Sequence, residues 1–198
     1  MKKILAFVLA LTVVMAMAAC TPANNNETTG AAEVLPANAL ELLTTTWSNF
    51  AEENKFPVMG GDEANINWEG PGSVVLPGAE GNALWNLNIP EDQLANFTEA
   101  ATMIHAMNTN IFAGCAVKLT EGADKTAVAQ AIADGIKGTH FMCGHPERLI
   151  VVSLGDYLVV AFGLDGVEEG NAKNITNFLT ALQTAYATAK VLHDEPLV

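Results

Sequence analysis

The sequence predicts an α+β fold in which helices pack on a single mixed, largely antiparallel sheet. Two near-continuous apolar segments, 148–154 and 157–163, are separated only by Gly155-Asp156, which is typical of a hairpin turn of the primed type. Other segments repeat apolar residues at helical spacing, and half of the 198 residues are hydrophobic, enough to bury a core. These observations favour one globular domain over residues 37–198.

The first twenty residues have the pattern of a bacterial lipoprotein signal. Two lysines precede an apolar run over 4–14, which is too short to cross about 30 Å of hydrocarbon. The segment Met17-Ala18-Ala19-Cys20 resembles a lipobox, so we expect residues 1–19 to be removed as a signal peptide and Cys20 to be lipidated. The alternative is an ordinary signal peptide followed by an incidental cysteine.

Residues 20–36 are expected to form the lipidated cysteine and a flexible spacer. As a coil, the 16 residues after Cys20 would reach roughly 20 Å from a membrane. Removal of the signal peptide leaves seven basic and 22 acidic residues, so the net charge changes from −13 to −15. Such an acidic chain is unsuited to nucleic acid and is repelled by anionic headgroups, so its expected attachment to the cell membrane is through acyl chains such as palmitate.

The domain is expected to begin with a helix over 37–55. Asn38 followed by Glu41 has the form of a capping box at its start. The apolar face of this helix would consist of Leu40, Leu43, Trp47 and Phe50.

The segment 56–82 is rich in glycine and proline and shows no clear period. It could contain a short edge strand over 73–76, or it could be a binding loop. Trp68 could stack on a sugar or a peptide there, but we favour a plug that anchors the loop to the core.

A strand is expected over 83–89, followed by a helix that begins at Pro90 and a second strand over 111–119. The strand 83–89 would place Trp85, Leu87 and Ile89 on one face. The helix after Pro90 would bury Leu94, Phe97, Ala101 and Ile104.

Two more helices complete the expected domain. Asp124 can cap the N-terminus of the first of them, and Gly138 lies where the C-terminal cap of this helix is expected. Asn174 begins the last helix, and residues 193–198 would form a short tail. The last helix would present Ile175, Phe178, Leu182, Tyr186 and Ala189 along one side.

Between Leu84 and about Leu192 the sequence contains the motifs Asn88-Ile89-Pro90-Glu91-Asp92, Phe112-Ala113-Gly114-Cys115-Ala116-Val117-Lys118, Pro146-Glu147 and Gly155-Asp156-Tyr157. With the lipobox in front, this pattern resembles the lipid-anchored proteins of Gram-positive bacteria called domain of unknown function forty-three fifty-eight. The resemblance implies an extracytoplasmic lipoprotein without an established activity, and it carries over no active-site residues. One departure is that the helical run 128–137 lacks the arginine that the family tends to have there.

The commonest enzyme signatures are absent, so the sequence predicts a protein that is not an enzyme and needs no cofactor. There is no Gly-x-Ser-x-Gly, no His-Glu-x-x-His and no phosphate-binding glycine loop. Met103, His105 and Met107 suggest copper at first sight. On the expected helix, however, the two methionines share a face and His105 points away.

Two cysteines remain after lipidation, Cys115 and Cys143. An extracytoplasmic compartment permits a disulfide between them, which would close 27 intervening residues and contribute on the order of 3 kcal/mol. Two separate thiols, with Cys115 as a small buried apolar residue, explain the pattern equally well.

His140, Cys143 and His145 form a His-x-x-Cys-x-His cluster that could bind zinc or copper, with Cys115 as a fourth ligand. Gly144 within it favours an ordinary turn instead. The leading expectation is therefore a non-enzymatic lipoprotein that binds or scaffolds a protein or glycan of the cell envelope. The alternative is an extracytoplasmic metal-binding protein that uses this cluster.

Overall fold

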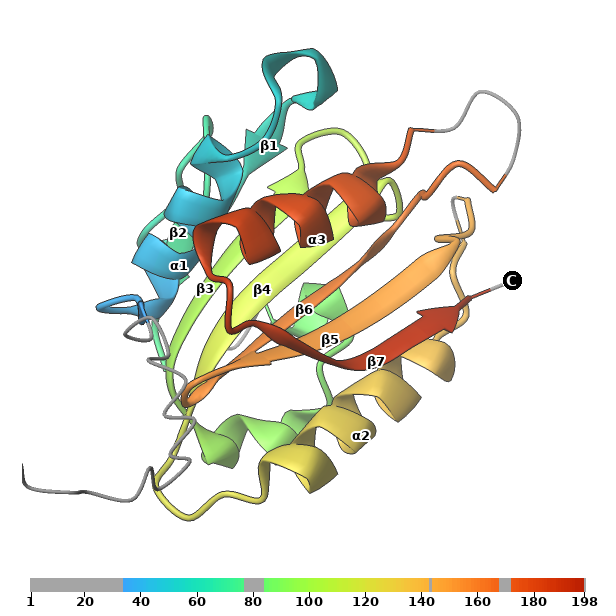
Figure 1. Ribbon diagram of the computed structural model, residues 1–198. Coiled ribbons are helices and arrows are strands. Elements are labelled where there is room, and N and C mark those ends of the chain that lie inside the picture. The colour runs from blue at the N-terminus through green and yellow to red at the C-terminus, as the bar shows by residue number, and fades with distance from the viewer. Residues whose placement is uncertain (1–33, 77–83, 143, 168–171, 198) are drawn as a thin grey trace, which may run out of the picture. The chain divides into compact units, whose positions relative to one another are not determined.

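In the computed structural model, residues 34–76, 84–142, 144–167 and 172–197 are described, and they build one open sheet with helices on both of its faces (Figure 1). All pairs of neighbouring strands are antiparallel, which confirms the predicted α+β fold and its largely antiparallel sheet. The strands are β1 (Val58–Met59), β2 (Gly72–Val74), β3 (Phe97–His105), β4 (Phe112–Leu119), β5 (Arg148–Leu154), β6 (Tyr157–Gly163) and β7 (Lys190–Pro196).

The strand order is β1-β3-β4-β6-β5-β7, and β2 also pairs with β3. Helices α1 and α3 cover one face, and α2 covers the other (Figure 1). No helix among the described residues has the length and apolar character needed to cross a bilayer. The helices are α1 (Ala39–Ser48), α2 (Lys125–Lys137) and α3 (Asn174–Ala185), with short 3-10 helices η1 (Glu52–Asn54), η2 (Trp85–Leu87) and η3 (Glu91–Asn96).

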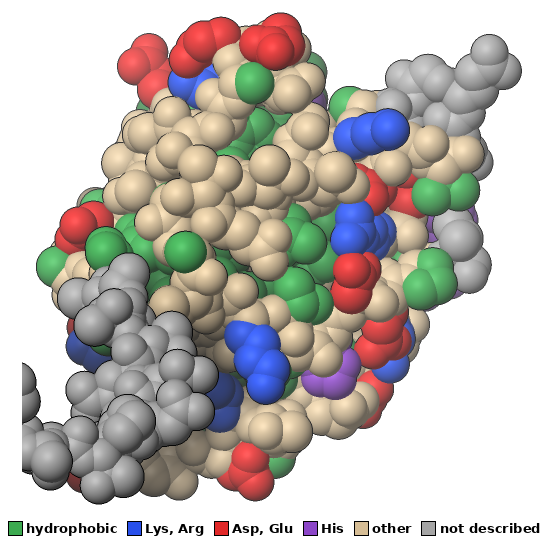
Figure 2. Space-filling view, in the orientation of Figure 1, with side chains coloured by type: hydrophobic (Ala, Val, Ile, Leu, Met, Phe, Trp, Pro, Cys, Tyr) green, Lys and Arg blue, Asp and Glu red, His purple; other side chains and the backbone are tan. Residues whose placement is uncertain are grey.

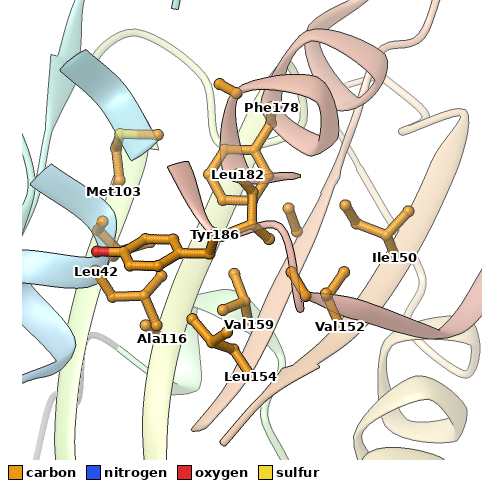
Figure 3. Close-up of a cluster of buried hydrophobic side chains, with 14 of the residues drawn as sticks. Leu42, Met103, Ala116, Ile150, Val152, Leu154, Val159, Phe178, Leu182 and Tyr186 are labelled. Carbon is orange, nitrogen blue, oxygen red and sulfur yellow. The ribbon is translucent and has the colours of Figure 1, made fainter. Parts of the chain in front are cut away.

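The central strands are buried on both sides because each face of the sheet has its own apolar layer. Every residue of β6 is buried, and its alternate side chains enter different layers. Between the sheet and α1 and α3, side chains from six elements meet (Figure 3): Leu42, Met103, Ala116, Ile150, Val152, Leu154, Val159, Phe178, Leu182 and Tyr186. Under α2 the second layer is formed mainly by Val117, Ile132, Ile136, Leu149, Leu158 and Phe162.

The predicted hairpin is confirmed, and its two strands pair from Leu154 with Tyr157 to Arg148 with Gly163. Gly155 has a φ of 51°, a left-handed conformation that favours glycine and that primed turns require. Helix α2 is also confirmed, since the Asp124 side chain accepts hydrogen bonds from the backbone N–H groups of Thr126 and Ala127. Its C-terminal Gly138 keeps a right-handed conformation, so no left-handed cap forms there.

Helix α1 is shorter than the predicted 37–55, since it ends at Ser48. The Asn38 side chain accepts a hydrogen bond from the Glu41 N–H at 2.8 Å, as the capping box predicts. The Glu41 carboxylate instead accepts from the N–H of Ala37 at 2.9 Å. Beyond Asn49 the chain turns, which lets Phe50 enter the core and leads into η1.

The prediction of a strand over 83–89 and a long helix after Pro90 is wrong. Leu84, Leu87 and Ile89 are buried, but they belong to a turn in which Asn88 has a left-handed φ of 58°. The helix after Pro90 is only the 3-10 helix η3, and Phe97 already belongs to β3. Because β3 is buried on both faces along much of its length, apolar and polar residues do not alternate along it, and the pattern typical of a strand is missing.

The predicted tail over 193–198 is also wrong, because His193 lies within the edge strand β7. The strand pairs with β5 from Ser153–Lys190 to Arg148–Pro196, with an irregularity beside Val151. Its charged residues are tolerated because only one of its edges pairs within the sheet. The short edge strand considered over 73–76 is found as β2, which lies over 72–74.

Candidate functional site

One open pocket of about 380 Å³ lies at the end of the sheet where β3 ends and α3 begins. Its size is at the lower end of the range for small-ligand sites. Two of its lining residues, His105 and Ile111, flank the turn between β3 and β4. The full lining consists of Glu53, Asn54, Lys55, Phe56, His105, Ile111, Ala172, Lys173, Asn174 and Asn177.

The aromatic wall of the pocket is the pair Phe56 and His105. Their ring centroids lie 5.4 Å apart with an angle of 25° between the planes, so the rings are stacked. Phe56 also contacts Phe112 at 5.2 Å and Trp47 at 5.3 Å between ring centroids. The wall is therefore continuous with the apolar layer beneath α1 and α3, which holds it in place.

The imidazole of His105 is held by backbone groups of the β3–β4 turn. Its Nδ1 accepts from the N–H of Met107 at 3.2 Å and from that of Asn108 at 3.3 Å. Partial burial lowers the pKa of His105, so the neutral ring is favoured at neutral pH. Since Nδ1 accepts both hydrogen bonds, the ring proton lies on Nε2, which can serve as a donor.

The opposite wall is the first turn of α3. The Asn174 side chain donates to the Ile111 carbonyl at 3.1 Å, which ties the start of α3 to the start of β4. Asn177 lines the pocket one turn later. Helix α3 carries no charged residue, and its exposed surface in Figure 2 is accordingly neither acidic nor basic.

The titratable side chains of the described lining are Glu53, Lys55, His105 and Lys173. None of the described lining residues is a serine, threonine or cysteine, and Glu53 is the single carboxylate among them. General acid–base catalysis by carboxyl groups needs two that converge from different environments. Lys55 is already engaged, because its Nζ pairs with Glu52 at 2.5 Å and lies 5.7 Å from the centre of the Trp47 ring.

A second polar cluster surrounds Arg148, the only arginine of the chain, and has a structural role. Its guanidinium donates to both carboxylate oxygens of Asp194, at 2.7 and 2.8 Å. It also donates to Asp165 at 2.7 Å and to the Thr176 hydroxyl at 2.9 Å. Asp165 in turn accepts from the Thr176 N–H at 2.7 Å, so the cluster fastens β5, β7 and the start of α3 together.

The residues predicted to bind metal or to form a disulfide are only partly described. His140 and His145 are exposed, and Cys143 lies outside the described residues. Within the described ranges, no group of three or more His, Cys, Asp or Glu side chains is arranged to hold a metal ion. The metal-binding alternative and the pairing of Cys115 with Cys143 both stay predictions.

Cys115 is fully buried in β4, and no disulfide partner for it lies among the described residues. Burial raises its pKa to about 12, so the thiol is protonated and unreactive at neutral pH. Cys20, the predicted lipidation site, also lies outside the described residues.

The prediction that Trp68 anchors its loop to the core is wrong, because 68% of the residue is exposed. Asp62 holds this loop instead, with a carboxylate that accepts from the backbone N–H groups of Ala64, Asn65 and Val75. An aromatic plug is therefore not needed to order the segment.

Sequence reasoning missed the pocket because it placed His105 on a helix. In the strand β3, Met103 and His105 point to the same face, where Met103 is fully buried and His105 reaches Phe56. Met107 is 83% exposed and lies beyond the strand, so these three residues do not form a common metal site.

No family model, no curated protein and no solved structure matches the chain.

Proposed function

We propose that the protein is a non-enzymatic binding module, anchored through Cys20 to the extracytoplasmic face of a cell membrane, and that the pocket beside His105 is its ligand site. The observation that supports the binding role is the pocket lining, which combines a stacked aromatic wall with amide and imidazole groups and includes no serine, threonine or cysteine among its described residues. The signal pattern and the lipobox support the location.

The lining favours a small polar ligand with hydroxyl or amide groups. Asn54 and Asn177 offer side-chain amides, and His105 offers a ring N–H. Amides can donate to and accept from such groups, while the ring face of Phe56 provides apolar contact. A sugar or a short peptide of the envelope has this chemistry.

Lipidation is tested by growing expressing cells with labelled palmitate and measuring the intact mass of the purified protein. We expect the wild type to incorporate the label and to lack residues 1–19, and the Cys20→Ala variant to incorporate none. Cys143→Ala is the matched control and should be labelled like the wild type. An unlabelled wild type, or one that retains its leader, contradicts the anchor.

The ligand site is tested by thermal shift and calorimetry of the purified lipoprotein against amino sugars, neutral sugars and dipeptides. We expect at least one of these probes to bind, and Asn177→Ala to weaken it about 3- to 10-fold, the value of one neutral hydrogen bond. Alanine is favourable within a helix, so the variant should stay folded.

Gln183→Ala provides the control, since it removes an exposed amide from the same helix outside the pocket lining. Its affinity for the probe should equal that of the wild type. Equal affinity of all three proteins for a bound probe places that probe elsewhere and refutes this ligand site.

A further inference from the structure

The spacer enters the domain at the end of the sheet that carries the β5–β6 turn. Pro36 is buried, and the Leu35 side chain lies so close to Gly155 that a Cβ built on this glycine would be 2.8 Å from Leu35 Cδ2. The N–H of Ala39 donates to Glu99 at 3.2 Å, and Glu99 also pairs with Lys118 at 3.1 Å. The first described residues are therefore fastened to this end.

The pocket lies at the other end of the same strands. Strand β4 begins at Phe112, next to the lining residue Ile111, and reaches Leu119, whose N–H donates to the Asp156 carbonyl at 2.9 Å. Eight residues of strand span roughly 26 Å. Figure 1 shows the β3–β4 turn and the β5–β6 turn at opposite ends of the sheet.

We infer that the anchored domain turns its β5–β6 end toward the membrane and its pocket away from it, so that its ligand is a polar molecule of the aqueous envelope and not a membrane lipid. This inference rests on the proposed anchor at Cys20. As a coil, the spacer would have a root-mean-square reach of roughly 20 Å, so most of its conformations would keep the β5–β6 end of the domain nearer to the anchor than the pocket, which lies roughly 26 Å farther along the strands. A net charge of −15 also opposes close approach of the domain to anionic headgroups.

Energy transfer to a membrane-surface dye measures this orientation in the full-length lipoprotein, reconstituted into vesicles with a labelled headgroup. The donor dye is placed at the exposed residue Met107, beside the pocket, or at the exposed residue Asp156, in the β5–β6 turn, through Met107→Cys or Asp156→Cys. Both variants also carry Cys143→Ser. Cys115 does not react, because its thiol is buried and protonated.

We expect the Asp156→Cys label to lie roughly 20 Å closer to the dye plane than the Met107→Cys label. Glu121→Cys, at the same end as Asp156, gives a second reading should the turn variant misfold. Equal or reversed distances overturn the orientation while leaving the anchor intact. A wild-type protein that does not stay with the vesicles overturns the anchor, and with it the orientation.

Discussion

The Phe178→Ala variant is expected to lose about 3–5 kcal/mol of unfolding free energy. Phe178 is fully buried on α3, and its ring centroid lies 5.3 Å from that of Phe112 and 6.4 Å from that of Phe50. Alanine would leave a cavity between α3 and the sheet that the neighbouring rings can fill only in part. Urea denaturation followed by circular dichroism measures the loss.

Thr180→Ala is the control for Phe178→Ala, since Thr180 is exposed on the same helix. It should be close to neutral, because alanine has the higher helix propensity. A loss below about 1 kcal/mol for Phe178→Ala would mean that α3 does not pack on the sheet as described.

For Arg148→Ala we expect a loss of about 2–4 kcal/mol at pH 7, somewhat below the range for fully buried pairs. The Arg148 side chain is 23% exposed, while its partners Asp165 and Asp194 are 9% and 44% exposed. Removal of the guanidinium leaves Asp165 without its cation in a nearly buried position. Arg148→Lys should restore little, because an ammonium cannot donate to both Asp194 oxygens in the same geometry.

The effect of Arg148→Ala should depend on pH. The hydrogen bonds from Arg148 lower the pKa of Asp194, although burial opposes the shift. A carboxyl group whose pKa is lower in the folded state stabilises the fold above its unfolded pKa of about 3.9 and loses this contribution as the pH falls through the folded value. The stability difference between wild type and variant should therefore shrink below about pH 4.

Denaturation at pH 7 and pH 3 measures this difference, with Lys190→Ala as the control. Lys190 lies on the same strand as Asp194, and its side chain is exposed. The control should show little change at either pH. A difference between wild type and Arg148→Ala that is the same at both pH values would contradict the assigned role of the ion pairs.

The elements with strong local signals could be predicted from the sequence. The β5–β6 hairpin has a two-residue turn between two apolar segments, and α2 has a capping aspartate followed by an apolar stripe. Both features depend on residues close in the chain. The tertiary structure confirmed them without altering their bounds by more than a residue or two.

The secondary-structure predictions were wrong where tertiary contacts outweighed the local conformational preference of the chain. Phe97, Ala101 and Ile104 have helical spacing, but β2 and β4 pair with this segment and hold it in the extended strand β3. The charged sequence of β7 is typical of an unstructured tail, because an edge strand does not need the alternation of apolar and polar residues that marks a buried strand.

The pocket could not be predicted for a related reason. Phe56 follows η1, His105 ends β3, and Asn177 lies on α3, so the three meet only because the sheet order brings their elements to one end. No spacing in the sequence links them.

The burial of β5 and β6 on both faces has a consequence for folding. If one face of a strand is polar, a shift of the pairing register by one residue exposes apolar side chains to water and is unfavourable. A strand that is apolar on both faces, such as β6, has no such penalty against the wrong register. The Gly155-Asp156 turn must therefore set the alignment of the pair. Until this turn closes, the stretches 149–154 and 157–163 have the composition of aggregation-prone segments. Replacement of Gly155, which needs a positive φ, should therefore yield misfolded, insoluble protein.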